Sequence, residues 1–240
     1  MATTALVLSA GAMYTAWEVG VWKALRERIP IDLIVGTSAG AWNGWAIAGG
    51  ATPDELAQDW LNPETAKIIQ IGLHGTGVLQ SDKLHAKARD LFARFQPRMP
   101  FGLTLAEVPR LKAALFRDRE IQWQHLAAAA SIPLGFPPVE IAGRHYVDGG
   151  LLGALPVWAA EEMGATRAIA VNAINILPFR LLRALTRPRQ PSAALHVINI
   201  EPSRKLGPLH DGLLWSGANI KRWIEQGEND GIRAATSITM

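Results

Sequence analysis

One serine stands in a setting typical of a catalytic nucleophile. Residues 36–40 read Gly-Thr-Ser-Ala-Gly and match the pattern G-x-S-x-G, with Ser38 at its centre. The apolar run 31–35 precedes this motif and predicts a buried strand, and residues 41–48 predict a helix after it. A sharp strand-to-helix turn exposes the serine hydroxyl in a strained conformation, and the helix N-terminus favours negative charge. We therefore interpret Ser38 as a candidate nucleophile rather than a purely structural turn residue.

A nucleophilic serine needs a group that accepts its proton. His196 and His210 follow Ser38 in the chain and could complete a Ser–Asp–His arrangement. However, His196 begins a predicted buried strand, and His210 lies in a Gly/Pro loop without a motif. Asp148 is the stronger candidate, because it ends a predicted strand and two glycines follow it. Parallel α/β sheets gather functional residues at the carboxyl ends of their strands, so we expect Asp148 and Ser38 at one edge.

The elements that would position these residues alternate between strand and helix. The middle of the chain, residues 52–130, is predicted to be mostly helical, with a strand-like pattern only near residues 116–123. The apolar patterns predict strands at 4–9, 31–35, 139–141, 144–147, 167–173 and 196–200, and helices at 14–28, 41–48, from 53, 81–92 and 155–163. With neither a repeat nor a linker, the chain reads as a single α/β domain, 1–240, with a mainly parallel sheet.

Three stretches together resemble the patatin-like phospholipase family. Residues 6–22, Leu-Val-Leu-Ser-Ala-Gly-Ala-Met-Tyr-Thr-Ala-Trp-Glu-Val-Gly-Val-Trp, are similar to the family's first strand, glycine-rich loop and helix. Residues 31–40 resemble its nucleophile elbow. The region around the family's dyad aspartate is matched by Ser-Ile-Pro at 131–133, residues 136–143, and Tyr-Val-Asp-Gly-Gly-Leu-Leu at 146–152. All three stretches occur in the family's order, so they are jointly more specific than any one motif.

The resemblance implies a three-layer α/β/α acyl-hydrolase fold of the patatin type. It also implies that Ser38 is the nucleophile and Asp148 its direct general base, without a histidine. The oxyanion hole would consist of the backbone N–H groups of Gly11, Ala12 and Ala39.

The loop after the first predicted strand, residues 10–15, departs from the family's pattern and is called the first loop below. The family carries G-x-G-x-x-G there, whereas this chain has Ala12 and Thr15 at two glycine positions, Ala10 at another, and only Gly11 unchanged. Tyr14 replaces the family's usual basic residue. Backbone donors survive a change from glycine to alanine, but a left-handed conformation disfavours a Cβ by about 1–2 kcal/mol. As a dinucleotide-binding fingerprint the loop fails.

Composition excludes several other kinds of chemistry. The chain has no cysteine, which removes disulfides, thiolate metal sites and a thiol nucleophile. The 24 basic and 21 acidic residues leave a net charge of only +3, so we do not expect nucleic acid as a partner. Residues 82–90 contain acids and His85, but we interpret them as a solvated helix face rather than a metal site. We expect neither a metal nor another cofactor.

The sequence carries no convincing signal peptide or membrane span, and we expect a cytoplasmic protein. The segment 175–189 mixes large apolar residues with four arginines. One interpretation is peripheral contact with an anionic membrane, and the other is an amphipathic helix packed on the core.

Three functions stay open at this stage. The first is a serine lipid acyl hydrolase, of phospholipase A or lysophospholipase type, that acts through a Ser38–Asp148 dyad and an acyl-enzyme. The second, prompted by the altered glycine loop, is a weakly active or inactive lipid-binding protein on the same fold. The third is an esterase that uses His196 or His210. The substrate-binding residues are not predicted.

Overall fold

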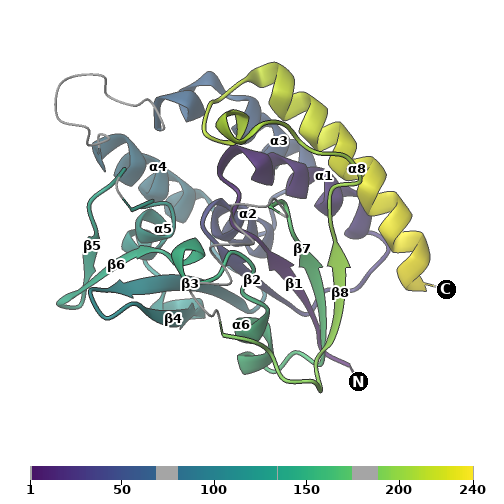
Figure 1. Ribbon diagram of the computed structural model, residues 1–240, viewed down its shortest axis with the longest axis horizontal. Coiled ribbons are helices and arrows are strands. Elements are labelled where there is room, and N and C mark those ends of the chain that lie inside the picture. The colour runs from purple at the N-terminus through teal and green to yellow at the C-terminus, as the bar shows by residue number, and fades with distance from the viewer. Residues whose placement is uncertain (1, 69–80, 134, 175–188, 240) are drawn as a thin grey trace.

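The architecture is that of an eight-stranded, mostly parallel sheet between helical layers (Figure 1). It is seen in a computed structural model that describes residues 2–68, 81–133, 135–174 and 189–239. The strand order is β5-β6-β3-β2-β1-β7-β8, and β4 pairs with β3 outside this path. The strands are β1 (Thr4–Leu8), β2 (Leu33–Thr37), β3 (Phe101–Val108), β4 (Lys112–Arg117), β5 (Val139–Ile141), β6 (Arg144–Asp148), β7 (Arg167–Val171) and β8 (His196–Ile200).

Parallel pairing joins β3, β2, β1, β7 and β8, whereas β4, β5 and β6 extend the sheet by antiparallel hairpins. The helices are α1 (Ala16–Leu25), α2 (Ala39–Ala48), α3 (Pro53–Leu61), α4 (Ser81–Arg94), α5 (Trp123–Ala129), α6 (Val157–Glu162) and α8 (Gly217–Thr239). This arrangement confirms the predicted three-layer α/β/α fold.

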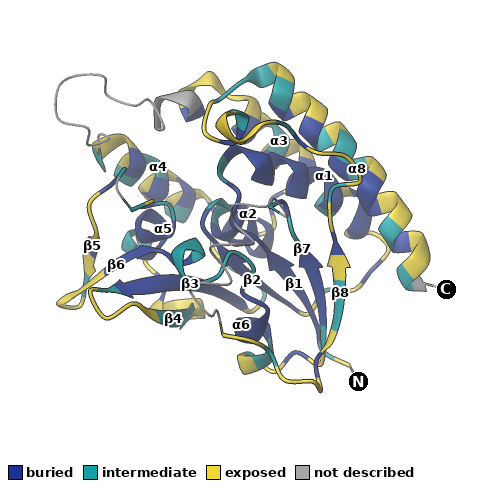
Figure 2. Ribbon diagram, in the orientation of Figure 1, coloured by how far each residue is buried: buried dark blue, intermediate teal, exposed yellow. Residues whose placement is uncertain are grey.

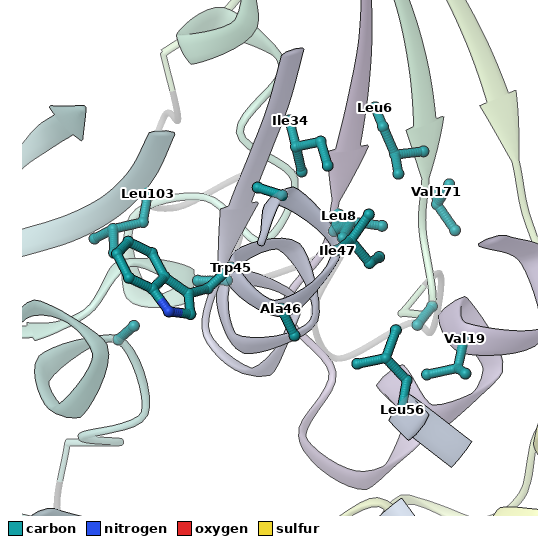
Figure 3. Close-up of a cluster of buried hydrophobic side chains, with 14 of the residues drawn as sticks. Leu6, Leu8, Val19, Ile34, Trp45, Ala46, Ile47, Leu56, Leu103 and Val171 are labelled. Carbon is teal, nitrogen blue, oxygen red and sulfur yellow. The ribbon is translucent and has the colours of Figure 1, made fainter. Parts of the chain in front are cut away.

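The two faces of the sheet pack into two separate cores, as the alternation of side chains along a strand requires. On β1, Leu6 and Leu8 join the larger core beneath α1 and α2 (Figure 3), whereas Ala5 and Val7 join a smaller core that α6 covers. Both faces of the central strands are therefore buried, which explains their continuous apolar runs (Figure 2).

The long C-terminal helix α8 lies directly on α1, and glycines make this close contact possible. A Cβ on Gly20 would come within 2.0 Å of the carbonyl oxygen of Ile224, and one on Gly227 within 2.0 Å of that of Trp17. The Trp17 indole N–H also donates to the buried Asp230 carboxylate at 2.9 Å. This contact fixes α8 on α1, the helix that follows the first loop.

Several boundaries and elements differ from the prediction. In the described part of the region 52–130, helices predominate as predicted, but the hairpin of β3 and β4, which was not predicted, lies among them. The strand-like pattern near 116–123 marks only the end of β4, and the helix that starts at Trp123 follows. Helix α1 begins later than predicted, after a 3₁₀ turn at Ala12–Thr15. Sequence reasoning did not predict α8.

Candidate functional site

The turn around Ser38 joins β2 to α2 with a strained backbone. Ser38 has φ 54° and ψ −137°, a conformation that costs a non-glycine residue about 1–3 kcal/mol. Two glycines leave room for it: a Cβ on Gly36 would lie 2.5 Å from the carbonyl oxygen of Gly40, and one on Gly40 2.3 Å from that of Ser9. The motif is therefore required by close backbone packing, and the turn has the geometry of the predicted elbow.

Strand β3 brings Asp148 to this turn. In the parallel pair, Thr37 lies opposite Thr104, and in the antiparallel pair, Leu105 lies opposite Asp148. The carboxyl ends of β2 and β6 thus meet on consecutive residues of β3. The prediction of a shared edge was right, but β6 runs antiparallel, and it reaches Ser38 because β3 continues beyond the end of β2.

The two side chains are in direct contact although 110 residues separate them. The Ser38 hydroxyl donates to Asp148 Oδ2 at 2.6 Å, and the Gly150 N–H donates to Oδ1 at 2.8 Å. Both residues are buried, with 5% and 7% of their surface exposed. Burial raises the pKa of Asp148 from 3.8 to about 6, against the opposing effect of the hydrogen bonds from Ser38 and Gly150.

Gly149 explains the rest of the Asp-Gly-Gly sequence. A Cβ at this position would lie 2.2 Å from the carbonyl oxygen of Thr104 on β3. The chain can therefore turn away directly after Asp148 only if glycine follows it. The close approach of Gly149 to β3 therefore explains both the glycine after Asp148 and the position of the Asp148 carboxylate.

The predicted oxyanion donors are the N–H groups of Gly11, Ala12 and Ala39. No described residue accepts a hydrogen bond from the N–H of Gly11, Ala12 or Ala39. Ala12 has φ 47°, in the left-handed region, so the loop keeps a glycine-like backbone despite its Cβ. The Thr15 hydroxyl donates to the Ala12 carbonyl at 2.7 Å, which closes the turn from within.

Tyr14, which stands at the family's basic position, attaches this loop to the C-terminal part of the chain. Its hydroxyl donates to the Pro208 carbonyl at 2.6 Å, and its ring packs edge-on against Trp223 at 4.9 Å. Ala10 is fixed as well, because its N–H donates to the Ala154 carbonyl at 2.7 Å. The substituted loop is therefore held on both sides.

Sequence reasoning missed a buried carboxyl group behind the loop. Glu18 is 1% exposed, and its Oε1 accepts from the Ser9 N–H at 2.9 Å and the Ser9 hydroxyl at 3.0 Å. Its Oε2 accepts from the Asn43 amide at 3.1 Å. Asn43 also donates to the Thr15 carbonyl at 3.0 Å and accepts from the Trp60 indole at 2.8 Å.

This cluster joins the end of β1, the first loop and the helix that follows Ser38. Burial raises the pKa of Glu18 from 4.5 to about 8, although Asn43 and Ser9 favour its charged form. The available signal was a single acid inside the otherwise apolar helix start 16–22.

Neither candidate histidine lies with Ser38. His196 begins β8 and is exposed, at the opposite end of the parallel strands from the elbow. His210 is also exposed, and its Nε2 lies 3.1 Å from the Asp211 carboxylate. The hydroxyl of Ser38 instead donates to Asp148, so the structure does not assemble the histidine-assisted arrangement.

The stretch 82–90 lies within α4, and its Leu84 and Ala88 face the core. Asp90 pairs with Lys87 and Arg94, and the His85 ring packs against Trp123.

The arginine-rich segment 175–189 lies outside the described residues except for Arg189. Its guanidinium pairs with Glu162 at 2.6 Å and lies over the Trp158 ring. Within the described part of the chain, no helix combines the length and the apolar character needed to cross a membrane.

Comparison with known proteins gives concordant matches. The family model "Patatin-like phospholipase" matches residues 6–161, nearly two thirds of the chain, including Ser38 and Asp148. The human patatin-like phospholipase domain-containing protein 6 is 25% identical over 182 residues, which cover 71% of this chain and 13% of that protein. An uncharacterized NTE family protein of Mycobacterium tuberculosis is 30% identical over 176 residues, covering 70% of this chain and 48% of the relative.

One solved structure has the same fold. VipD from Legionella pneumophila superimposes with a TM-score of 0.55 at 11% identity, over 98% of this chain and 67% of that one. The chain thus spans only about an eighth of the mammalian relatives and about half of the mycobacterial one.

Proposed function

The chain belongs to the patatin-like phospholipase family, and on this premise we propose that it hydrolyses carboxylic esters of lipids through a Ser38–Asp148 dyad. The observation that carries the proposal is the 2.6 Å hydrogen bond from the Ser38 hydroxyl to the buried Asp148 carboxylate. A nucleophile, a base and a set of unpaired backbone donors are the parts that acyl transfer needs.

In the first half-reaction, Ser38 Oγ attacks the ester carbonyl carbon while its proton moves to Asp148 Oδ2. A carboxylate with a pKa near 6 is ionised at neutral pH and is a stronger base than an ordinary aspartate. The tetrahedral intermediate then collapses: the bond to the alkoxy oxygen breaks, Asp148 returns the proton to the leaving alcohol, and an acyl-serine remains.

In the second half-reaction, water attacks the acyl-serine and gives its proton to Asp148. Collapse of the second intermediate returns that proton to Ser38 Oγ and releases the fatty acid. In both steps the carbonyl oxygen becomes negatively charged and needs hydrogen-bond donors. The N–H groups of Gly11, Ala12 and Ala39 could donate to it, because no described residue accepts a hydrogen bond from them. The loss of one such donor typically costs about a hundredfold or more in rate.

The decisive experiment is labelling with a fluorophosphonate, followed by mass mapping of the modified peptide. We expect the wild-type chain to be labelled on Ser38, and Ser38→Ala to be unlabelled. Ser237→Ala, which removes an exposed serine near the end of α8, should be labelled like the wild type. Labelling at another residue, or equal labelling of Ser38→Ala, would contradict the dyad.

The conformation of Ala12 favours one second candidate, a lipid-binding protein with little or no turnover. Its left-handed backbone carries a Cβ that the family's glycine lacks, which disfavours the donor geometry. This candidate predicts binding of fatty acid without labelling of Ser38. Rapid labelling would exclude it.

A further inference from the structure

Exposed leucines gather in one short segment between β8 and α8. Leu209, Leu213 and Leu214 are 48%, 48% and 54% exposed. The described residues contain seven exposed large apolar side chains, with 36% to 59% of their surface exposed, and three of them fall within these six positions. Leu61, 38% exposed, follows Trp60, whose carbonyl accepts from the indole of Trp215 next to this segment. Grouped apolar side chains at a surface indicate an interaction site more than scattered ones do.

The leucines project from a well-anchored segment. The Pro208 carbonyl accepts from the Tyr14 hydroxyl at 2.6 Å, and Gly212 lies so close to the Tyr14 ring that a Cβ would come within 2.7 Å of it. The Trp215 indole donates to the Trp60 carbonyl at 3.0 Å. Fraying therefore does not explain their exposure. In Figure 2 the connection between β8 and α8 is coloured largely as exposed.

Basic residues border the leucines. Residues 201–222 carry Arg204, Lys205, Lys221 and Arg222 against Glu201 and Asp211, which makes four positive charges minus two negative, or +2. All four basic residues are exposed. The Arg222 guanidinium donates to the Leu206 carbonyl at 3.0 Å, so this charge lies over the start of the same segment.

This surface also adjoins the candidate site. Tyr14 belongs to the loop that carries Gly11 and Ala12, and it contacts Pro208 and Gly212 directly. Arg204 and Lys205 line a hollow of about 130 Å³ together with Glu201, Tyr14 and Ala173, which follows β7. The surface therefore contacts the first loop through Tyr14. The segment lies beyond residue 161, where the family match ends.

We propose that residues 204–214 form a docking surface for an anionic lipid membrane. Leu209, Leu213 and Leu214 would enter the acyl region, and Arg204 and Lys205 would contact headgroup phosphates. Apolar side chains with cations beside them match the two layers of such a membrane, whereas a protein interface core is usually depleted of charge. The proposal rests on the proposed function, because a lipid hydrolase must take its substrate from such a surface.

Vesicle sedimentation with the full chain tests this surface. The probes are phosphatidylcholine vesicles with and without added phosphatidylglycerol. We expect binding to require the anionic lipid, and Leu209→Ser, Leu213→Ser and Leu214→Ser combined to weaken it at least about a hundredfold. Arg204→Gln with Lys205→Gln should weaken it about thirtyfold at low salt.

Leu111→Ser is the matched control, because this leucine is 59% exposed in the turn between β3 and β4. It should bind vesicles like the wild type. Unchanged vesicle binding by the triple leucine variant would overturn the proposal and leave a protein partner as the occupant. An equal loss in Leu111→Ser would overturn it too, because the segment 204–214 would then have no specific role.

A second readout separates this proposal from the proposed function. The leucine and basic variants should keep fluorophosphonate labelling and the rate with a short water-soluble ester, with unchanged thermal unfolding. Ser38→Ala should lose labelling but still bind anionic vesicles. A chain that binds vesicles without labelling would support the docking surface and contradict the hydrolase.

Discussion

Two carboxyl groups are buried near the elbow, and they differ in their hydrogen-bond partners. Asp148 faces a serine hydroxyl at a strand end, with one backbone N–H on its other oxygen. Glu18 lies on α1, behind the first loop, and accepts three hydrogen bonds from Ser9 and Asn43. Burial raises the pKa of both, to about 6 for Asp148 and to about 8 for Glu18.

The difference shows that burial by itself does not mark a catalytic acid. Both carboxyl groups accept a hydrogen bond from a serine hydroxyl, so the two sites differ in where that serine stands. Ser38 stands in the strained turn between β2 and α2, whereas the Ser9 hydroxyl, at the end of β1, also accepts from the Ala173 N–H at 2.9 Å. Glu18 thus connects Ser9 to Asn43 on α2, and in the proposed function only Asp148 exchanges a proton with its serine.

Removing the Asp148 charge should produce the largest effect. We expect Asp148→Asn, like Ser38→Ala, to lower kcat/KM for a short ester at least about a thousandfold, because the amide cannot accept the serine proton. Glu18→Gln should retain far more activity than either. Steady-state kinetics on the three variants measures the contrast. A Glu18→Gln loss as large as that of Asp148→Asn would remove the distinction between the two acids.

The second prediction concerns stability. The pKa of Glu18 is raised from 4.5 to about 8, so between these pH values the folded protein keeps a proton that the unfolded chain has lost. The contribution of Glu18 to the free energy of unfolding therefore falls as pH rises from 4.5 to 8, by up to about 1.4 kcal/mol per pH unit. Glu18→Gln should remove this slope.

Urea unfolding at pH 5 and pH 8 measures that slope as a difference between wild type and variant. Glu140→Gln, on the exposed side of β5, is the control and should unfold with the wild-type pH dependence. Parallel curves for the wild type and Glu18→Gln would show that the Glu18 carboxyl does not titrate as its burial requires.

The third prediction is a change of about tenfold in activity with pH. Asp148 must be ionised to accept the serine proton, and its pKa is about 6. The value of kcat/KM should therefore rise with pH to a plateau above neutrality and be about tenfold lower at pH 5 than at pH 7. The midpoint should stay near 6 in Glu18→Gln. A shift of this midpoint in Glu18→Gln would show that the ionisation of Asp148 depends on Glu18.

The smallest effect concerns the loop that Glu18 supports. Ala12→Gly should raise the free energy of unfolding by less than about 1 kcal/mol, since relief of the left-handed strain is partly offset by the entropy of glycine. Ala142→Gly is the matched control, because Ala142 has φ 49° in the exposed β5–β6 turn. Thermal unfolding compares the two. A clear loss of stability in Ala12→Gly alone would show that the Ala12 methyl group stabilises the loop by packing.

Much of the site could be predicted because its residues stand in local patterns. The glycines at 36 and 40 mark the elbow, and those at 149 and 150 mark the turn after Asp148. Their contacts are local only in part: a Cβ on Gly36 would meet Gly40, whereas one on Gly149 would meet Thr104 on β3. The strands β1, β2, β7 and β8 were predicted from apolar runs. Strands β1, β2 and most of β7 are buried on both faces, and β8 is buried at its carboxyl end.

Strand β3 and helix α8 escaped prediction for a physical reason. Residues 101–108 contain a glycine and a polar threonine, and their strand conformation is stabilised by pairing with β2, β4 and β6, which are distant or follow later in the chain. Helix α8 is polar on its outer face, and its glycines are required only because they pack closely against α1.

The sequence by itself determined the types of chemical group and the local turns that present them, since steric limits act between neighbours in the chain. Tertiary structure decided which groups meet. Strand β3 set the 2.6 Å contact between Ser38 and Asp148, and packing of α1 on the sheet buried Glu18 against Ser9 and Asn43. Contacts across 110 residues depend on strand register and on the exclusion of water, and both arise only when the whole sheet forms.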